Sequence, residues 1–413
     1  MSPFLQFLLA LGVIITAAKI GGLLSARWGQ PSVLGELLAG LVLGPTAINL
    51  FGLPAFSDSH LPETIKHLAE VGVILLMFVA GMEIDLGEMV RAGRVATFTG
   101  TLGVLAPIAL GAIATLPFGF SPLHALFVGV ILSATSVSIS AQTLIELGVL
   151  RRREGVALLG AAVIDDVLVI LVLSLFLALT GGAGGSGVLS LLGLVLRMAL
   201  YLGGALALGL WVLPWLTRAV SRLPVSEGIT TLAVVLTFFL AWSAEVLGGV
   251  AAITGAFIAG LGFSRSALRE EIERGMHTLA YALFVPVFFV SIGLEANARA
   301  LNMDLAVFTL VICLVAVISK LVGAGLGARL AGFTSDEALR VGVGMVSRGE
   351  VGLIVATVGL SQGLVTPEIF TATAIMVLFT TLVTPLLLRL AFAEVAEALP
   401  QLRPKEATDI DDG

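Results

Sequence analysis

The sequence has few charged residues and a single cysteine, and each shortage narrows the class of protein. Charged residues make up 12% of the 413 residues, and hydrophobic residues make up 58%. A soluble domain carries about 25% charged residues, so this apolar excess does not fit a water-soluble core. One cysteine, Cys313, excludes a disulfide framework and a cysteine metal site. The chain has no basic tract, and no nucleic-acid partner is expected.

Alternating strand patterns and a cleavable leader are missing as well. Their absence excludes an outer-membrane barrel and a removed signal peptide, so the first apolar run is predicted to be a retained helix. Long apolar runs recur instead, many of them long enough to cross ~30 Å of hydrocarbon as a helix. We predict an all-α membrane protein with about 13 transmembrane helices. Their approximate spans are 3–26, 32–51, 64–86, 92–116, 121–147, 153–179, 187–217, 226–247, 249–265, 272–295, 303–331, 335–362 and 366–395.

Lysine and arginine concentrate in every second predicted loop. The main positions are Arg27; Arg91 and Arg94; Arg151, Arg152 and Arg153; Arg218 and Arg222; Arg265, Arg269 and Arg274; and Arg329 and Arg340. Because these residues favour cytoplasmic loops, the N-terminus is predicted outside and the C-terminus in the cytoplasm of an inner (plasma) membrane. An odd number of helices also allows two inverted repeats joined by a linker helix at 187–217.

The strongest chemical signal is the pair Asp165 and Asp166, which falls near the middle of the predicted helix 153–179. An ionisable group at bilayer depth is costly and is by default a functional candidate. Neighbouring residues on a helix point about 100° apart, so the two carboxyl groups can face different partners. Carboxylate oxygen suits a hard cation, and a buried carboxyl group can also hold a proton. The pair is therefore predicted to exchange protons for a metal cation.

Three further groups of polar residues lie inside predicted helices. Lys320 lies mid-span in 303–331 and needs a counter-charge, which either aspartate could supply. A hydroxyl cluster in 121–147 predicts a helix that unwinds and offers oxygen atoms to an ion. In 335–362, glycines surround Arg348 and Glu350. A structural role for these two charged residues would be to pair and to neutralise buried helix ends. The hydroxyl cluster consists of Ser133, Thr135, Ser136, Ser138 and Ser140.

Two other functions compete with ion exchange for these residues. An intramembrane aspartyl protease needs carboxylates from separate helices around one water, which adjacent aspartates do not provide easily. A sodium-coupled carrier of organic anions would use an open cavity, with sodium as the driver. The residues favour cation/proton exchange over both, and they leave Na⁺ against K⁺ open, because that choice depends on ligand geometry.

Several motifs resemble those of bacterial cation/proton antiporters, in the same order along the chain. They are QPSVLGELLAGLVLGP, ATSVSISAQTLIELGVL, LLGAAVIDDVLVILVL, GAFIAGL and VGVGMVSRGEVGLIVA. The chain looks most like the electrogenic two-aspartate, NapA-type branch, which is related to NhaA and to Kef-type systems. The specific part is GAAVIDD followed by the lysine of ISKLVG. Ser347 departs from the family pattern, because several relatives have proline there.

The resemblance implies an NhaA-like antiporter fold, with inverted repeats and two broken, crossing helices. It implies a dimerisation domain at 1–90 and 226–297 and a core transport domain at 91–180 and 300–395. A linker helix would lie at 187–217 and a disordered cytoplasmic tail at 396–413. The partners would be membrane lipids, monovalent cations, protons and a second copy in a homodimer.

The resemblance also assigns roles to single residues. Asp166 would be the principal carrier of cation and proton, and Asp165 would pair with Lys320. Thr135 and Ser136 match the first helix break, and Arg348 and Glu350 match the charged second break. The expected function is secondary transport without enzyme activity or cofactor: electrogenic, elevator-like exchange of Na⁺ (or Li⁺ or K⁺) for H⁺. K⁺/H⁺ antiport is kept as an alternative.

Overall fold

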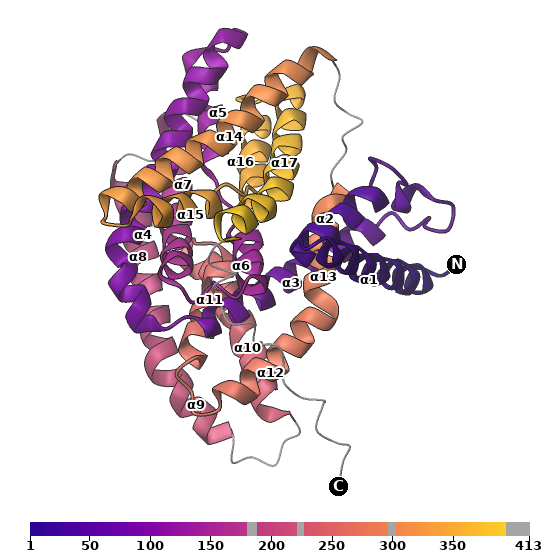
Figure 1. Ribbon diagram of the computed structural model, residues 1–413, viewed down its shortest axis with the longest axis vertical. Helices are drawn as coiled ribbons and strands as arrows, with labels where there is room; N and C mark the ends of the chain where they lie inside the picture. Colours follow the sequence, from indigo (N-terminus) through magenta and orange to yellow (C-terminus); the bar gives the residue numbers. More distant parts are fainter. Residues whose placement is uncertain (180–187, 221–226, 296–302, 394–413) are drawn as a thin grey trace.

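The computed structural model describes residues 1–179, 188–220, 227–295 and 303–393, and its elements are helices joined by turns (Figure 1). No strand occurs in those ranges, so the all-α prediction is confirmed. The predicted tail, 396–413, lies outside the described residues. The α-helices are α1 (Pro3–Arg27), α2 (Ser32–Leu43), α3 (Leu61–Glu83), α4 (Leu86–Thr115), α5 (Pro122–Ser133), α6 (Val137–Glu146), α7 (Arg153–Leu179), α8 (Val188–Ala207), α9 (Leu213–Val220), α10 (Gly228–Ser243), α11 (Ala252–Phe263), α12 (Arg269–Leu279), α13 (Val285–Glu295), α14 (Met303–Leu330), α15 (Ser335–Gly344), α16 (Glu350–Ser361) and α17 (Pro367–Ala391).

Side-chain caps explain where several of these helices begin. Each capping oxygen accepts a hydrogen bond from a backbone N–H group of the first helical turn, which has no partner inside the helix. The caps are Ser2 of α1, Asp85 of α4, Ser121 of α5, Thr334 of α15 and Thr366 of α17. Proline follows directly in α1, α5 and α17, where its fixed φ suits the first position. The predicted start of α4 at residue 92 is wrong, because Asp85 caps the helix earlier.

Prolines explain most of the other differences from the predicted spans. The helix predicted at 32–51 stops at Leu43, because Pro45 disfavours a helical conformation at Gly44, which is extended with ψ −177°. Two π-helical segments, Leu208–Val212 and Ala280–Phe284, precede Pro214 and Pro286. Proline cannot donate to the preceding turn, and the π-segments accommodate that loss. The predicted helices 187–217 and 272–295 are thus each divided into two α-helices.

Ten of the described helical stretches are long and apolar enough to cross a membrane. Three shorter apolar helices fall in the remaining predicted spans: Ser32–Leu43, Ala252–Phe263 and Val351–Leu360. At least one apolar helix of the described residues thus lies within each predicted span. A helix of 12 residues covers only about 18 Å, so thirteen full crossings stay a prediction.

The helices pack into two groups. Helices α4–α7 and α14–α17, here called the aspartate group, are centred on α14, which lies along α4 and against α15 and α17. Helices α1–α3 and α10–α13, here called the flanking group, are joined by α3 against α11 and by α2 between α1 and α13. In Figure 1 most of the aspartate group lies above, and the flanking group lies to the right and below. The two groups meet where α6 packs on α2 and α3.

Two glycines bring α3 and α11 into direct backbone contact. A Cβ added at Gly81 of α3 would overlap the carbonyl of Phe257, and one added at Gly260 of α11 would overlap the carbonyl of Phe78. Small residues at facing positions allow this approach, which is typical of helix pairs in membranes. Helix α11 is therefore held firmly within the flanking group.

Candidate functional site

Asp165 and Asp166 both lie inside the protein, in the middle of α7. Asp165 is 0% exposed and Asp166 is 6% exposed. Because consecutive side chains on a helix diverge, the two carboxyl groups have different surroundings. Asp165 faces α14 and pairs with a lysine, and Asp166 lines a cavity bounded by α3, α6, α7 and α11. The two acids are neighbours in the sequence, but the helix points one toward Lys320 and the other toward the cavity.

Lys320 of α14 is the partner of Asp165. Its Nζ donates a hydrogen bond to Asp165 Oδ1 in an ion pair, and both side chains are completely buried. Lys320 therefore does not extend to the membrane surface, which is the alternative for a lysine in an apolar helix. Gly103 of α4 lies beside the pair, and a Cβ added there would stand 3.6 Å from Lys320 Nζ. Helix α4 thus covers the pair.

The first helix break separates α5 from α6. Ala134 and Ser136 have extended backbone conformations, with ψ of 141° and 104°, so the helical hydrogen bonding stops at Ser133 and resumes at Val137. Thr135 is buried, and its Oγ1 has no hydrogen-bond partner among the described residues. Asp165 Oδ2 is in the same situation. Buried polar atoms are normally paired, so two unpaired oxygen atoms on adjoining elements fit the binding of a water or a hard cation.

The second helix break separates α15 from α16, and its residues contact those of the first break. Ser136 donates its backbone N–H to the carbonyl of Ser347 at 2.9 Å, and Ser347 Oγ donates back to the carbonyl of Ser136 at 2.5 Å. Ser140 Oγ donates to the carbonyl of Gly344 at 2.6 Å. The hydroxyl of Ser347 thus satisfies a free carbonyl of the other broken helix. The backbone groups released by both interruptions bind one another.

This contact predicts a measurable loss of stability for Ser347→Ala. The change leaves the Ser136 carbonyl without its hydroxyl donor, and a hydrogen bond contributes about 1 kcal/mol. The free energy of unfolding should fall by that amount, which a thermal unfolding midpoint in detergent would report. Ser133→Ala is the matched control, because Ser133 Oγ donates only to Val130 of its own helix. Equal midpoints for both variants would contradict the contact between the breaks.

Arg348 lies near the end of the second break, just before the first residue of α16, and is completely buried. Its Nη1 donates to the carbonyls of Met345 and Val346, at 3.1 and 2.7 Å, and its Nη2 donates to the carbonyl of Ala316 at 2.9 Å. The guanidinium therefore lies over the negative end of α15, where a cation is favourable. Glu350, which was predicted to balance charge at this break, begins α16, and its side chain lies outside the described ones.

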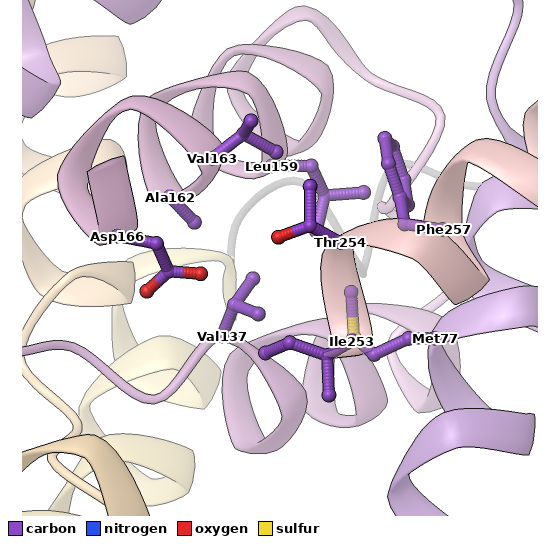
Figure 2. A pocket seen from close by; sticks show the side chains of 9 residues that line it. All are labelled: Met77, Val137, Leu159, Ala162, Val163, Asp166, Ile253, Thr254 and Phe257. Atoms are coloured by element: carbon purple, nitrogen blue, oxygen red, sulfur yellow. The ribbon is translucent and has the colours of Figure 1, made fainter. Parts of the chain in front are cut away.

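A small cavity lies between α7 of the aspartate group and α3 and α11 of the flanking group. Its volume is about 10 Å³, enough for roughly one water-sized particle. Figure 2 shows the carboxyl group of Asp166 on one side and the hydroxyl of Thr254 on the other. The remaining lining is apolar: Met77, Val137, Leu159, Ala162, Val163, Ile253 and Phe257.

Glu146 connects the two helix groups at the end of α6. Its carboxylate accepts hydrogen bonds from Ser32 N at 2.5 Å, Ser32 Oγ at 2.7 Å and Val33 N at 3.3 Å, which form the first turn of α2. Gln142 donates to the same carboxylate, and Tyr281 donates to Gln142 at 2.7 Å. A carboxylate at the positive end of a helix is well placed. It ties the first broken helix to the flanking group.

A family model described as "Sodium/hydrogen exchanger, transmembrane" matches residues 13–393, more than nine-tenths of the chain. The chain belongs to the sodium/hydrogen exchanger family. The exchanger is 39% identical over 395 residues to the Na⁺/H⁺-K⁺ antiporter GerN of Bacillus cereus, which covers 95% of this chain and 98% of GerN. It is 36% identical to an Na⁺/H⁺ antiporter of Enterococcus hirae, over 93% of this chain and 98% of that protein.

The exchanger also has the fold of a solved relative. The sodium proton antiporter of Methanocaldococcus jannaschii at pH 8 matches 95% of this chain and 98% of its own, with a TM-score of 0.69 and 19% identity. The antiporter fold, the monovalent cation/proton antiporter family and the classification as a transporter rather than an enzyme are thus confirmed. The NapA-type branch and the roles of single residues stay predictions.

Sequence reasoning missed three residues of this site. Thr254 lies in a motif, AAITGAFIAGL, of which only the apolar part stood out. Ser347 stood out only as a departure from the family, and Glu146 was not singled out. Among the described residues, no group of three or more histidine, cysteine or acidic side chains could hold a resident metal ion.

Proposed function

We propose that this exchanger moves Na⁺, or Li⁺ or K⁺, in one direction and protons in the other, with Asp166 as the carrier of both. The carrying observation is a buried Asp165–Lys320 pair beside Asp166, at the crossing of two broken helices, in a chain of this family. Irregular backbone at membrane depth is tolerated where it is buried or lines a cavity, and it is typical of ion sites in transporters.

Coupling follows from competition at Asp166. The cavity beside it has room for roughly one water-sized particle, so a protonated carboxyl group and a bare cation exclude each other. A charged carboxylate that binds neither a proton nor a cation in this small, mostly apolar cavity is unfavourable, which disfavours movement of the unloaded site. The small volume also favours an inorganic ion over an organic anion as the substrate.

The Asp165–Lys320 pair gives a basis for electrogenic exchange. When the pair opens, Asp165 can join Asp166 in binding the cation, and Lys320 can release its proton. Two protons then exchange for one cation, and net charge crosses the membrane. Thr135 and Ser136 would add oxygen ligands from the first break, while Arg348 and Glu350 would balance charge at the second.

The two helix groups suggest how the site changes sides. The aspartate group would be the transport domain, and the flanking group would form the dimer scaffold against which it slides in elevator-like fashion. The predicted orientation places the loop with Arg151, Arg152 and Arg153 in the cytoplasm of a plasma membrane. A homodimer would keep the scaffold fixed during the movement.

The choice between Na⁺ and K⁺ is open to a direct measurement. The name of GerN includes both ions, which supports K⁺ as a second substrate of this exchanger. Purified protein in liposomes with an imposed ΔpH should collapse that gradient on addition of Na⁺, and the same liposomes on a solid-supported membrane should show a sodium-induced current. Dissipation without current would reject electrogenic exchange, and no dissipation with Na⁺, Li⁺ or K⁺ would reject antiport altogether.

A further inference from the structure

The cavity beside Asp166 contains a second oxygen-bearing side chain, from the opposite helix group. Of the residues that line it, Asp166 and Thr254 supply oxygen atoms, and the others are apolar or, for Met77, a thioether. A water or an ion in a cavity of this size needs two or more polar partners. Asp166 contacts a particle in the cavity from one side only. The Thr254 hydroxyl on the opposite wall can therefore act as its second polar partner.

The packing of α11 fixes the position of the Thr254 hydroxyl at the cavity. Thr254 lies in the first turn of α11, it is 3% exposed, and Figure 2 shows its hydroxyl oxygen directed toward the side of the cavity where Asp166 lies. Helix α11 is fixed against α3 through Gly81 and Gly260, so its position is set by the flanking group. Asp166, in contrast, belongs to α7 of the aspartate group. The cavity is therefore walled by both groups.

We propose that Thr254 is a binding residue for the transported ion, acting in one of the two access states only. Its hydroxyl binds the cation at Asp166, or the single water retained by that cation, in the conformation that this structure shows. When the aspartate group slides, Asp166 moves with α7 and Thr254 stays with α11, so the contact is lost on the other side of the membrane. This inference rests on the proposed function, because it needs Asp166 to be the carrier. It gives the exchanger a different cation affinity on each side.

The test compares Thr254→Val with Thr254→Ser. Valine keeps the shape and removes the hydroxyl, and serine keeps the hydroxyl. The Na⁺ concentration for half-maximal ΔpH dissipation is measured in everted and in right-side-out membrane vesicles. Thr254→Val should raise it about tenfold in one vesicle orientation, as expected for a lost hydrogen bond to a charged group. The other orientation and the maximal rate should change little, and Thr254→Ser should restore the wild-type value.

The control is Thr237→Val, which removes a buried threonine hydroxyl from α10, where it bonds to Ala233 of its own helix. It should leave both orientations unchanged. An unaltered half-maximal concentration in Thr254→Val, or an equal rise in both orientations, would overturn the inference. Asp166→Asn separates the two ideas: if that variant exchanges ions normally, the proposed function fails; if it is inactive while Thr254→Val behaves as wild type, only the role of Thr254 fails.

Discussion

Asp166→Asn should reduce sodium-driven proton exchange to about 1% of the wild-type rate or less. Asparagine has nearly the same volume, so the cavity keeps its shape, but an amide neither releases a proton nor offers a negative charge. Removing one member of a buried charged interaction costs about 3 kcal/mol or more, which is over a hundredfold in an equilibrium constant. The measurement is ΔpH dissipation in liposomes with equal amounts of each protein.

The matched control for this change is Glu70→Gln. Glu70 is a carboxylate of α3 whose side chain is 58% exposed, and its Oε2 lies 3.4 Å from Nδ1 of the similarly exposed His67. The same chemical change at that position should leave exchange unaltered. The thermal midpoint of Asp166→Asn in detergent should stay close to that of the wild type, which separates loss of transport from loss of fold. Retention of a tenth or more of the wild-type rate would contradict the assignment of Asp166 as carrier.

Lys320→Ala should destabilise the protein more than Ser347→Ala or Asp166→Asn. The variant leaves Asp165 buried without its partner, and an uncompensated buried charge costs about 3–5 kcal/mol. The thermal midpoint in detergent should fall by about 5 °C or more. Sodium-induced current should also disappear, because this variant lacks the lysine that we propose as the carrier of the second proton.

A double variant separates the structural from the transport role of this pair. Asp165→Asn with Lys320→Met removes both charges at similar volume, and replacement of a buried pair by uncharged groups is often neutral for stability. Its thermal midpoint should therefore recover most of the loss. Its current should remain absent. A Lys320→Ala protein as stable as the wild type would contradict the structural role of the pair, and a double variant with full current would contradict its role in transport.

Much of this site could be predicted because charged residues are rare in an apolar chain. In helices of this hydropathy, Asp165, Asp166 and Lys320 stand out without any knowledge of their contacts, since a membrane helix has little other use for them. The interruption at Ser133–Ser136 followed from a run of hydroxyl residues with weak helical preference. The capping residues Ser121, Thr334 and Thr366 likewise mark helix starts in the sequence itself.

The missed features depend on contacts between elements far apart in the chain. Thr254 resembles many threonines of apolar helices, and only the packing of α11 on α3 brings it opposite Asp166. Ser347 and Ser140 gain their role from the crossing of two breaks that are more than 200 residues apart. The length of α2 was overestimated because the apolar sequence pattern continues past Pro45, whereas the helical backbone ends at Leu43.

The hydrogen bonds of Glu146 bear on the rate at which the two helix groups can move relative to each other. Its carboxylate holds the first turn of α2 through hydrogen bonds of 2.5 to 3.3 Å, and a displacement of α6 away from α2 by about 2 Å would carry all of them beyond hydrogen-bonding range. Water would then have to solvate both the carboxylate and the exposed N–H groups at each turnover. In the proposed elevator-like movement these hydrogen bonds would have to break at each change of side, so we expect them to slow the switching of the carrier without contacting the transported ion.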